Sequence, residues 1–250
     1  MGTALGVDVG LAKGLDIVLL QDDLRVGYIK RRVRVSELAD EVSHLRPDIV
    51  AIDSPPAWAP VGGRATERFL RKMNLQLYAT PTEDRQSKKG FHDWMLVGMQ
   101  AFASISPDYP LFDGNAYNLS SIEVFPHASA VVLAGHLRPN DWEKTQWRRK
   151  VLEEHNVAST DLTSPDLVDA GLAALTGLRA LGGRACWFGN PNEGVIVLPS
   201  DSATVLSKYG PHLAKVEASA LSPKVCSQCM YANPPIAKFC NQCGSRLKLD

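Results

Sequence analysis

Apolar runs and alternating positions divide the first part of the chain into strands, turns and one helix. Two apolar runs and one alternating segment predict three strands, over residues 4–9, 15–21 and 25–35. Glycine and aspartate between these segments favour tight turns, and hence an antiparallel meander. Ser36 is the predicted N-cap of a helix that ends at Leu45, before Pro47. The nearly uninterrupted apolar run 48–53 predicts a central strand that is covered on both faces.

Helical periodicity dominates the chain after Pro56. Helices are predicted over residues 64–73, 92–104, 127–135, 143–155 and 165–181. A further strand is predicted over 121–125, and two short strands, 185–188 and 195–198, form a predicted hairpin. This order of elements predicts an α/β fold, with a mixed five-stranded sheet flanked by helices.

Length and composition bound the domain organisation. The chain has 250 residues, 45% hydrophobic and 22% charged, so it can form one large core and a small appendage. We expect a large domain over 1–208, a linker over 209–223 and a C-terminal module over 224–250. No apolar run approaches the ~20 residues that a membrane span needs, and the N-terminus lacks a signal-like segment. The expected protein is soluble and cytoplasmic, with no membrane partner.

Charge is balanced overall but unevenly distributed. The 223 residues before the C-terminal module carry 23 basic and 26 acidic side chains, which excludes a surface that is basic throughout. Basic clusters occur over residues 30–34 and 144–150, and solvated faces explain them at least as well as nucleic-acid contacts do. Any nucleic-acid contact is therefore expected to be local.

Four of the five cysteines form two Cys-x-x-Cys pairs: Cys226, Cys229, Cys240 and Cys243. This spacing directs four thiolates at one tetrahedral Zn²⁺, and Gly244 permits the tight turn that such a pair needs. About 25 residues cannot form a sufficient core, so zinc would supply most of the folding free energy. The module resembles short zinc ribbons, in which the zinc is structural. The fifth cysteine, Cys186, lies in an apolar strand and is expected in the core.

Four aspartates lie where carboxylates are costly: Asp8, Asp53, Asp166 and Asp169. Asp8 and Asp53 belong to apolar strands, and the other two begin the predicted helix 165–181 on one face, because residues three apart adjoin on a helix. Like charges held together raise each other's pKa unless a cation neutralises them. Carboxylates on two strand ends and one helix therefore predict a site for Mg²⁺ or Mn²⁺.

The order of these elements resembles the ribonuclease H-like fold. In that fold the first and fourth strands are neighbours at the sheet centre, which implies that Asp8 and Asp53 adjoin. A similarity to Holliday-junction resolvases implies that the late helix adds Asp166 and Asp169, completing a four-carboxylate site in which Asp8, Asp53 and Asp169 bind metal. Two Mg²⁺ or Mn²⁺ ions there would activate water and stabilise the leaving oxygen. The expected activity is metal-dependent hydrolysis of phosphodiester bonds in DNA or RNA.

Six short motifs carry a closer resemblance: Gly6-Val7-Asp8-Val9-Gly10, Lys13-Gly14, Ile52-Asp53-Ser54-Pro55, Glu67-Arg68, Glu123-Val124-Phe125-Pro126 and Asp169-Ala170-Gly171-Leu172-Ala173-Ala174-Leu175. These motifs are similar to the domain of unknown function 429 family, and the match covers most of residues 4–200. Members are described as predicted nucleases with a ribonuclease H-like fold. Gly171 interrupts the usual Asp-Ala-x-x-Ala pattern and costs some helix stability. Glu123 is a further candidate at the site, as an extra ligand or as an ion-pair partner.

Two other functions remain compatible with the sequence. Asp8-Val9-Gly10 also resembles the phosphate loop of actin-like and sugar-kinase ATPases, but those proteins need a second domain with a second such loop. The only other clear match, Asp113-Gly114, lacks a preceding strand of useful length. In the other alternative the large domain is catalytically silent, and the zinc ribbon recognises nucleic acid or a protein as an adaptor.

Overall fold

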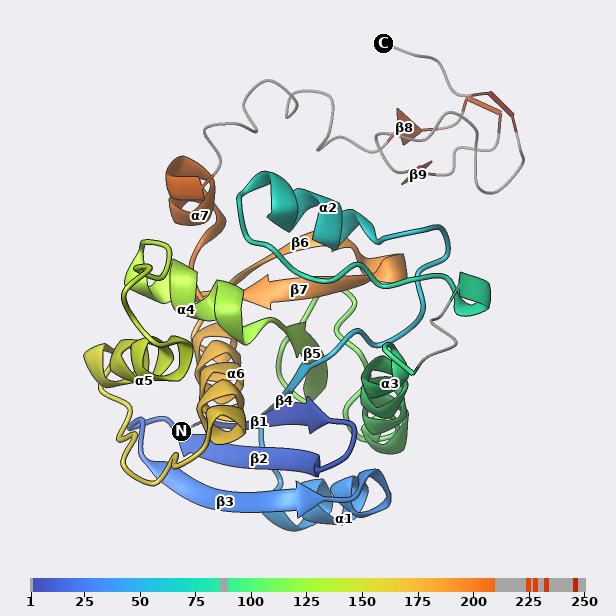
Figure 1. Ribbon diagram of the computed structural model, residues 1–250. Helices are drawn as coiled ribbons and strands as arrows, with labels where there is room; N and C mark the ends of the chain where they lie inside the picture. The colour runs from blue at the N-terminus through green and yellow to red at the C-terminus, as the bar shows by residue number, and fades with distance from the viewer. Residues whose placement is uncertain are drawn as a thin grey trace.

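A seven-stranded sheet with helices on both faces forms the large domain (Figure 1). The structure is a computed structural model that describes residues 2–85, 90–209, 224–225, 227–228, 232–233 and 245–246. The strands are β1 (Thr3–Gly10), β2 (Gly14–Gln21), β3 (Val26–Val33), β4 (Ile49–Asp53), β5 (Ser120–Val124), β6 (Cys186–Asn190) and β7 (Gly194–Leu198), with β8 (Lys224–Val225) and β9 (Ala232–Asn233) paired separately. The helices are α1 (Val35–Leu45), α2 (Ala65–Lys72), α3 (Asp93–Ile105), α4 (Pro126–Ala134), α5 (Lys144–Glu154), α6 (Pro165–Leu181) and α7 (Ser202–Tyr209), with short 3-10 helices η1 (Glu83–Arg85) and η2 (Pro191–Glu193).

The strand order in the sheet is β3-β2-β1-β4-β5-β7-β6. The first three strands form the predicted antiparallel meander, and β4 then pairs with β1 in parallel. β5 and β7 continue the parallel run, and β6 closes the edge in the antiparallel direction. Because β1, β4, β5 and β7 are parallel, their carboxyl ends meet at one edge of the sheet, where side chains from different strands come together.

Each face of the sheet has its own apolar core, because successive strand residues point to opposite faces. On one face Ala4 and Ile49 pack with buried residues of α4, α5 and α6. On the other face Leu5 and Val50 pack with buried residues of α1 and α3. The same alternation decides on which face each polar residue near a strand end must lie.

The helix α6 lies unusually close to β1. A Cβ atom built on Gly6 would be 1.9 Å from the carbonyl oxygen of Ala170 and 2.5 Å from the amide nitrogen of Ala174, and real contacts never come that close. Gly177 likewise lies against Ala4 and Ile49, where an added Cβ would be 3.0 Å from each side chain. The absence of side chains at these two positions lets the backbone of α6 rest on the sheet.

Most of the predicted elements are confirmed, with three differences. The six predicted helices and the meander are present, and the 185–198 segment is a hairpin. The sheet has seven strands instead of five, because β7 pairs with β5 and adds the hairpin to the main sheet. Ser36 is not the N-cap, because α1 begins at Val35 with Arg34 at the capping position and Glu37 accepting its amide. The helix α7 was not predicted.

The C-terminal module lies almost entirely outside the described residues. All four cysteines expected to bind zinc fall there, so the zinc ribbon stays a sequence-based prediction. Cys186, in contrast, is buried as expected. Among the helices that the structure describes, none is long and apolar enough to cross a membrane.

Candidate carboxylate site

Asp8 and Asp53 are direct neighbours on the two central strands. They are register partners in the parallel pairing of β1 with β4, at the carboxyl ends of both strands. Asp8 shares its face with Gly6, and Asp53 shares its face with Ile49 and Ala51, so both side chains point to the side of the sheet that α6 covers. The expected adjacency of these two aspartates is therefore present.

The first turns of α6 bring two more carboxylates toward this pair. Ser164 caps the helix by accepting the Leu167 amide at 3.2 Å, and Pro165 occupies the first helical position. The close contact of α6 with Gly6 then sets Asp169 and Asp166 near enough to Asp8 that both raise its pKa. The structure thus gathers all four predicted aspartates at one end of the sheet.

Among the four aspartates, Asp8 and Asp53 are the two without a hydrogen-bond or ion-pair partner in the described residues. In the described part of the chain, no side chain or amide donates a hydrogen bond to either of them. Burial and the charges of Asp53 and Asp169 raise the pKa of Asp8 to about 9. Burial and Asp169 raise the pKa of Asp53 to about 8, although Arg148 opposes this shift. Such an environment disfavours two bare negative charges and favours a cation between them.

The two helix aspartates, in contrast, already have basic partners. Nη1 of Arg148, on α5, donates to both carboxylate oxygens of Asp169. Burial raises the pKa of Asp169, and Arg148 opposes that rise. Nζ of Lys13 lies 3.1 Å from Asp166, and this pair is more exposed, with 66% of the lysine side chain accessible to solvent.

Sequence reasoning did not assign three further residues near the site. Asp16 is the register partner of Asp8 on β2, is buried, and accepts hydrogen bonds from the Arg31 side chain at 3.0 Å and the Arg32 amide at 2.9 Å. Lys144 begins α5, is exposed, and opposes the raised pKa of Asp53. His127 follows β5; burial and nearby basic groups lower its pKa to about 4. The basic cluster 144–150 contained the signal for Lys144 and Arg148, but only helix packing selects them.

Glu123 does not join this group. It is the register partner of Ile52 on β4, so its side chain points to the opposite face from Asp53. Both oxygens accept from Arg64 at 2.6 Å, and Arg64 also donates to Glu67 at 2.9 Å. All three side chains are buried. Of the two roles considered for Glu123, the structure gives it the ion pair.

A metal site is only partly formed by these residues. In the part of the chain that the structure describes, no group of three or more His, Cys, Asp or Glu side chains is arranged to hold a metal ion. Arg148 and Lys13 engage two of the four aspartates. Asp8 and Asp53 remain available, and their carboxylate oxygens are the ligand type that Mg²⁺ and Mn²⁺ prefer. The donor chemistry of this pair therefore fits a divalent cation, whereas the full four-carboxylate metal site stays a prediction.

A comparison with protein families assigns the large domain to a family. The family model described as "Protein of unknown function (DUF429)" matches residues 6–193, which is most of the chain. The chain belongs to the DUF429 family. The match runs from β1 to the end of η2, so it includes all four aspartates and excludes the cysteine-rich module. No curated protein matches this sequence.

Two solved structures are among those similar to this DUF429 protein. The Thermus thermophilus RuvC structure is 16% identical, with a TM-score of 0.37, and the match covers 72% of this chain and 95% of that one. T. thermophilus RuvC in complex with a Holliday junction substrate is 17% identical, with a TM-score of 0.41, covering 73% and 95%. Identities and TM-scores this low transfer no activity from RuvC to this chain.

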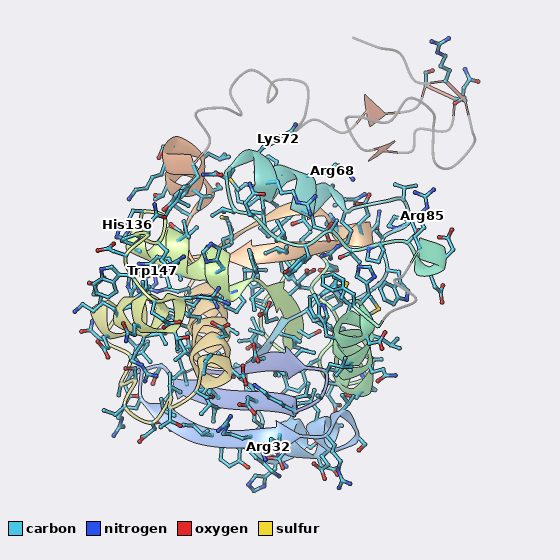
Figure 2. All side chains as sticks on the ribbon, in the orientation of Figure 1. Arg32, Arg68, Lys72, Arg85, His136 and Trp147 are labelled. Atoms are coloured by element: carbon cyan, nitrogen blue, oxygen red, sulfur yellow. The ribbon has the colours of Figure 1, made fainter. Side chains whose placement is uncertain are left out.

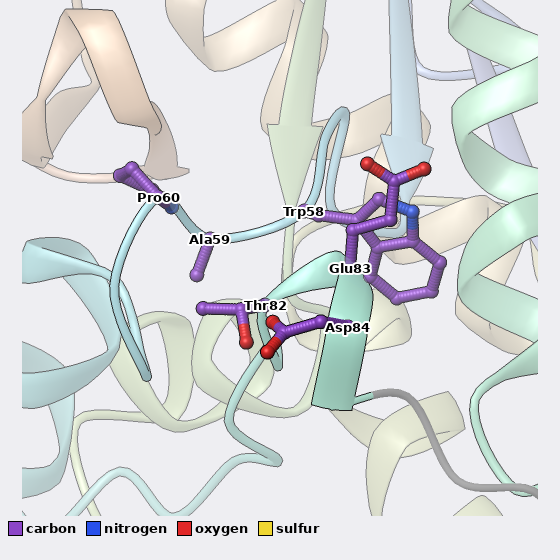
Figure 3. A pocket seen from close by; sticks show the side chains of 6 residues that line it. All are labelled: Trp58, Ala59, Pro60, Thr82, Glu83 and Asp84. Atoms are coloured by element: carbon purple, nitrogen blue, oxygen red, sulfur yellow. The ribbon is translucent and has the colours of Figure 1, made fainter.

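A separate cavity of about 650 Å³ lies in the loops that follow β4. Figure 3 shows its lining from two segments, residues 58–60 and residues 82–84. A hydrogen bond of 3.0 Å from the Ala59 amide to the Pro81 carbonyl joins these segments. Among the described residues, the lining includes two acids, Glu83 and Asp84, and none of the four aspartates. This cavity is therefore distinct from the carboxylate site.

Basic side chains of the described residues lie on well-separated parts of the domain. Figure 2 shows Arg68 and Lys72 on α2 at the top of the view and Arg32 on β3 at the bottom. Arg68 and Arg71 also donate to the backbone carbonyls of Gly63 and Leu77, so part of their hydrogen-bonding capacity serves the fold. Two exposed lysines lie near the carboxylates of the DUF429 domain. Lys13 pairs with Asp166, and the charge of Lys144 acts on Asp53.

Proposed function

We propose that this DUF429 protein is a metal-dependent nuclease that hydrolyses phosphodiester bonds in DNA or RNA at the Asp8–Asp53 pair. The observation that carries the proposal is the register pairing of these two unpartnered carboxylates at the carboxyl ends of the central parallel strands. Burial and mutual repulsion raise the pKa of both carboxyls, so their charged forms are disfavoured until a cation binds between them. Proteins accept that cost at sites where a ligand or reaction requires it.

A ribonuclease H-like arrangement belongs to the same proposal. The adjacency of the first and fourth strands and the position of a late helix over them support it. In this arrangement Asp8 and Asp53 hold the cation from the sheet, and α6 covers one side of the site. Asp8 and Asp53 are half-buried, and the part of them that solvent reaches is left for a nucleic-acid strand.

The chain's own residues have defined tasks in this proposal. Asp8 and Asp53 bind a divalent cation, which supplies Lewis-acid stabilisation of the charge that develops on the phosphoryl oxygens. Lys144 and Lys13 are exposed near the carboxylates and attract the phosphate backbone toward them. The neighbouring Asp16 is held by Arg31 and the Arg32 amide, so it shapes the electrostatics of the pair without competing for the cation.

A cleavage panel tests the proposed function. Branched, single-stranded and RNA-containing substrates are incubated with the full chain and Mn²⁺ or Mg²⁺. We expect cleavage of at least one substrate class by the wild type and its loss in Asp8→Asn. Asp22→Asn is the matched control, because Asp22 is an exposed aspartate in the β2–β3 turn. Absence of metal-dependent cleavage across the panel, or equal cleavage by Asp8→Asn, would contradict the proposal.

The zinc ribbon is a second, independent part of the proposed function. Its support is the matched spacing of Cys226, Cys229, Cys240 and Cys243, which suits one structural Zn²⁺. A local contact with nucleic acid would agree with the balanced charge of the rest of the chain. Metal analysis of protein purified without chelators should give one zinc per chain, and a value well under one would contradict this part.

A further inference from the structure

Arg148 is held in the carboxylate site as a buried cation. It is 4% exposed, and Nη1 contacts both oxygens of Asp169, whose side chain is 14% exposed. Its Nε atom is also buried and has no hydrogen-bond partner within the described residues. A buried guanidinium is costly unless a nearby negative charge neutralises it. Asp169 provides that charge, so each of the two groups depends on the other.

The charges near the site balance in a specific way. Five aspartates, Asp16 included, contribute five negative charges when ionised, and three of them are matched by Arg148, Lys13 and Arg31. The two that remain are the register partners Asp8 and Asp53, to which no side chain or amide of the described residues donates a hydrogen bond. One divalent cation neutralises this remainder. Two divalent cations would instead leave an excess of positive charge, with Arg148 already buried beside them.

We propose that the site binds one divalent cation, between Asp8 and Asp53, and that Arg148 takes the place of a second one. The proposal rests on the metal-dependent function argued above and replaces the two-ion arrangement expected from the sequence. In this arrangement Asp169 is a positioning residue, because it holds the guanidinium and leaves the metal to the strand aspartates. Lys13 is mostly exposed, so its ion pair with Asp166 is weaker than the buried pair of Arg148 with Asp169.

Counting bound Mn²⁺ tests this arrangement without relying on cleavage. Calorimetric titration and electron paramagnetic resonance of the full chain should give one Asp8-dependent Mn²⁺ for the wild type. Arg148→Gln removes the resident cation and frees Asp169, so two Mn²⁺ ions should bind. Arg148→Lys keeps the charge and should retain one. Lys150→Gln is the matched control on α5, because Lys150 is exposed and lies 4.0 Å from Glu154, away from the aspartates.

A double variant separates charge from metal ligation. Arg148→Gln with Asp169→Asn replaces the ion pair by two neutral amides, and it should still bind one Mn²⁺ with affinity within about threefold of wild type. If Asp169 were a metal ligand, the same double variant would lose an ion or bind tenfold or more weakly. Two Mn²⁺ ions on the wild type, or one on Arg148→Gln, would overturn the proposal. The wild-type count decides the question even if Arg148 variants do not fold.

The number of bound Mn²⁺ ions tests the role of Arg148, and the cleavage panel tests the nuclease function, so each proposal can be contradicted without the other. One Asp8-dependent Mn²⁺ without cleavage of any substrate would contradict the nuclease function and support the assignment of Arg148. Two Mn²⁺ ions with Asp8-dependent cleavage would support the nuclease and overturn the role of Arg148. Failure of the wild type to bind Mn²⁺ at all would contradict both.

Discussion

Two acidic groups lie at the carboxyl ends of neighbouring strands, yet they accommodate charge in opposite ways. Glu123, with Glu67, is buried on one face and fully engaged by Arg64. Asp8 and Asp53 lie on the other face without a donor among the described residues. The Glu67 carboxylate also accepts from the amide and hydroxyl of Thr80, so the first group ties a loop to the sheet. The first group serves the fold, and the second remains available for a ligand.

The largest expected effect tests the unpartnered pair. Asp8→Asn keeps the side-chain shape and removes one metal ligand, so metal-dependent cleavage should fall by about 100-fold or more. Without metal, thermal stability should hold or rise, because repulsion with Asp53 is relieved. Initial cleavage rates and thermal melting in chelator measure the two effects. A strongly destabilised apo protein would show that Asp8 is structural.

The next effect tests the engaged group. Glu123→Gln leaves the Arg64 guanidinium buried without its bidentate partner, so the free energy of unfolding should fall by about 3–5 kcal/mol. Urea denaturation measures this loss. Glu154→Gln is the control, because that carboxylate is exposed, and its effect should stay within about 0.5 kcal/mol. An equal loss of unfolding free energy in both variants would contradict the stabilising role assigned to the buried Glu123–Arg64 pair.

A smaller expected effect is the change in protein stability with pH that the titration of Asp8 and Asp53 causes. An aspartate has an ordinary pKa of 3.8, whereas Asp8 and Asp53 titrate near 9 and 8 in the folded chain. Between these values the folded state binds more protons than the unfolded state, so stability falls as pH rises and levels off above about 9. His127, with its pKa lowered to about 4, gives the opposite slope below its ordinary value of 6.5.

The range from pH 7 to 8.5 contains the pKa of Asp53 and lies just below that of Asp8. Urea denaturation of the metal-free protein should show decreasing stability across this range, with a shallower slope in Asp8→Asn. Stability that rises from pH 7 to 8.5 would contradict the raised pKa values.

The smallest expected effect concerns the exposed ion pair. Lys13→Gln removes the partner of Asp166, but the lysine is two-thirds exposed and water replaces most of the interaction. The free energy of unfolding should change by less than about 1 kcal/mol. A larger loss of unfolding free energy, measured by urea denaturation, would show that the Lys13–Asp166 pair stabilises the fold.

Hydrophobic periodicity predicted most of the fold because helices and strands in this chain carry clear patterns. The paired runs 4–9 and 48–53 are confirmed as adjacent central strands, and the late helix lies over them. The hairpin's place in the sheet was not predictable from its own residues. It depends on pairing between β5 and β7, which are far apart in the sequence.

The site was less predictable than the fold, for a geometric reason. Glu123 and Asp53 both end apolar strands, but a one-residue difference in register puts them on opposite faces. Arg148 stood in a basic cluster that looked equally suited to solvent, and only the packing of α5 against α6 selects it as the partner of Asp169. Single-sequence patterns do not contain such long-range choices.

Gly6 ties the spacing of the site to a position that carries no chemistry. Since α6 rests directly on its backbone, any side chain at position 6 acts as a wedge under the helix. A side chain there would displace the α6 backbone that carries Asp169, while the Asp8–Asp53 register would persist in the sheet. A substitution at Gly6 would therefore change the distance from Asp169, on α6, to the strand aspartates Asp8 and Asp53. No charged residue would need to change.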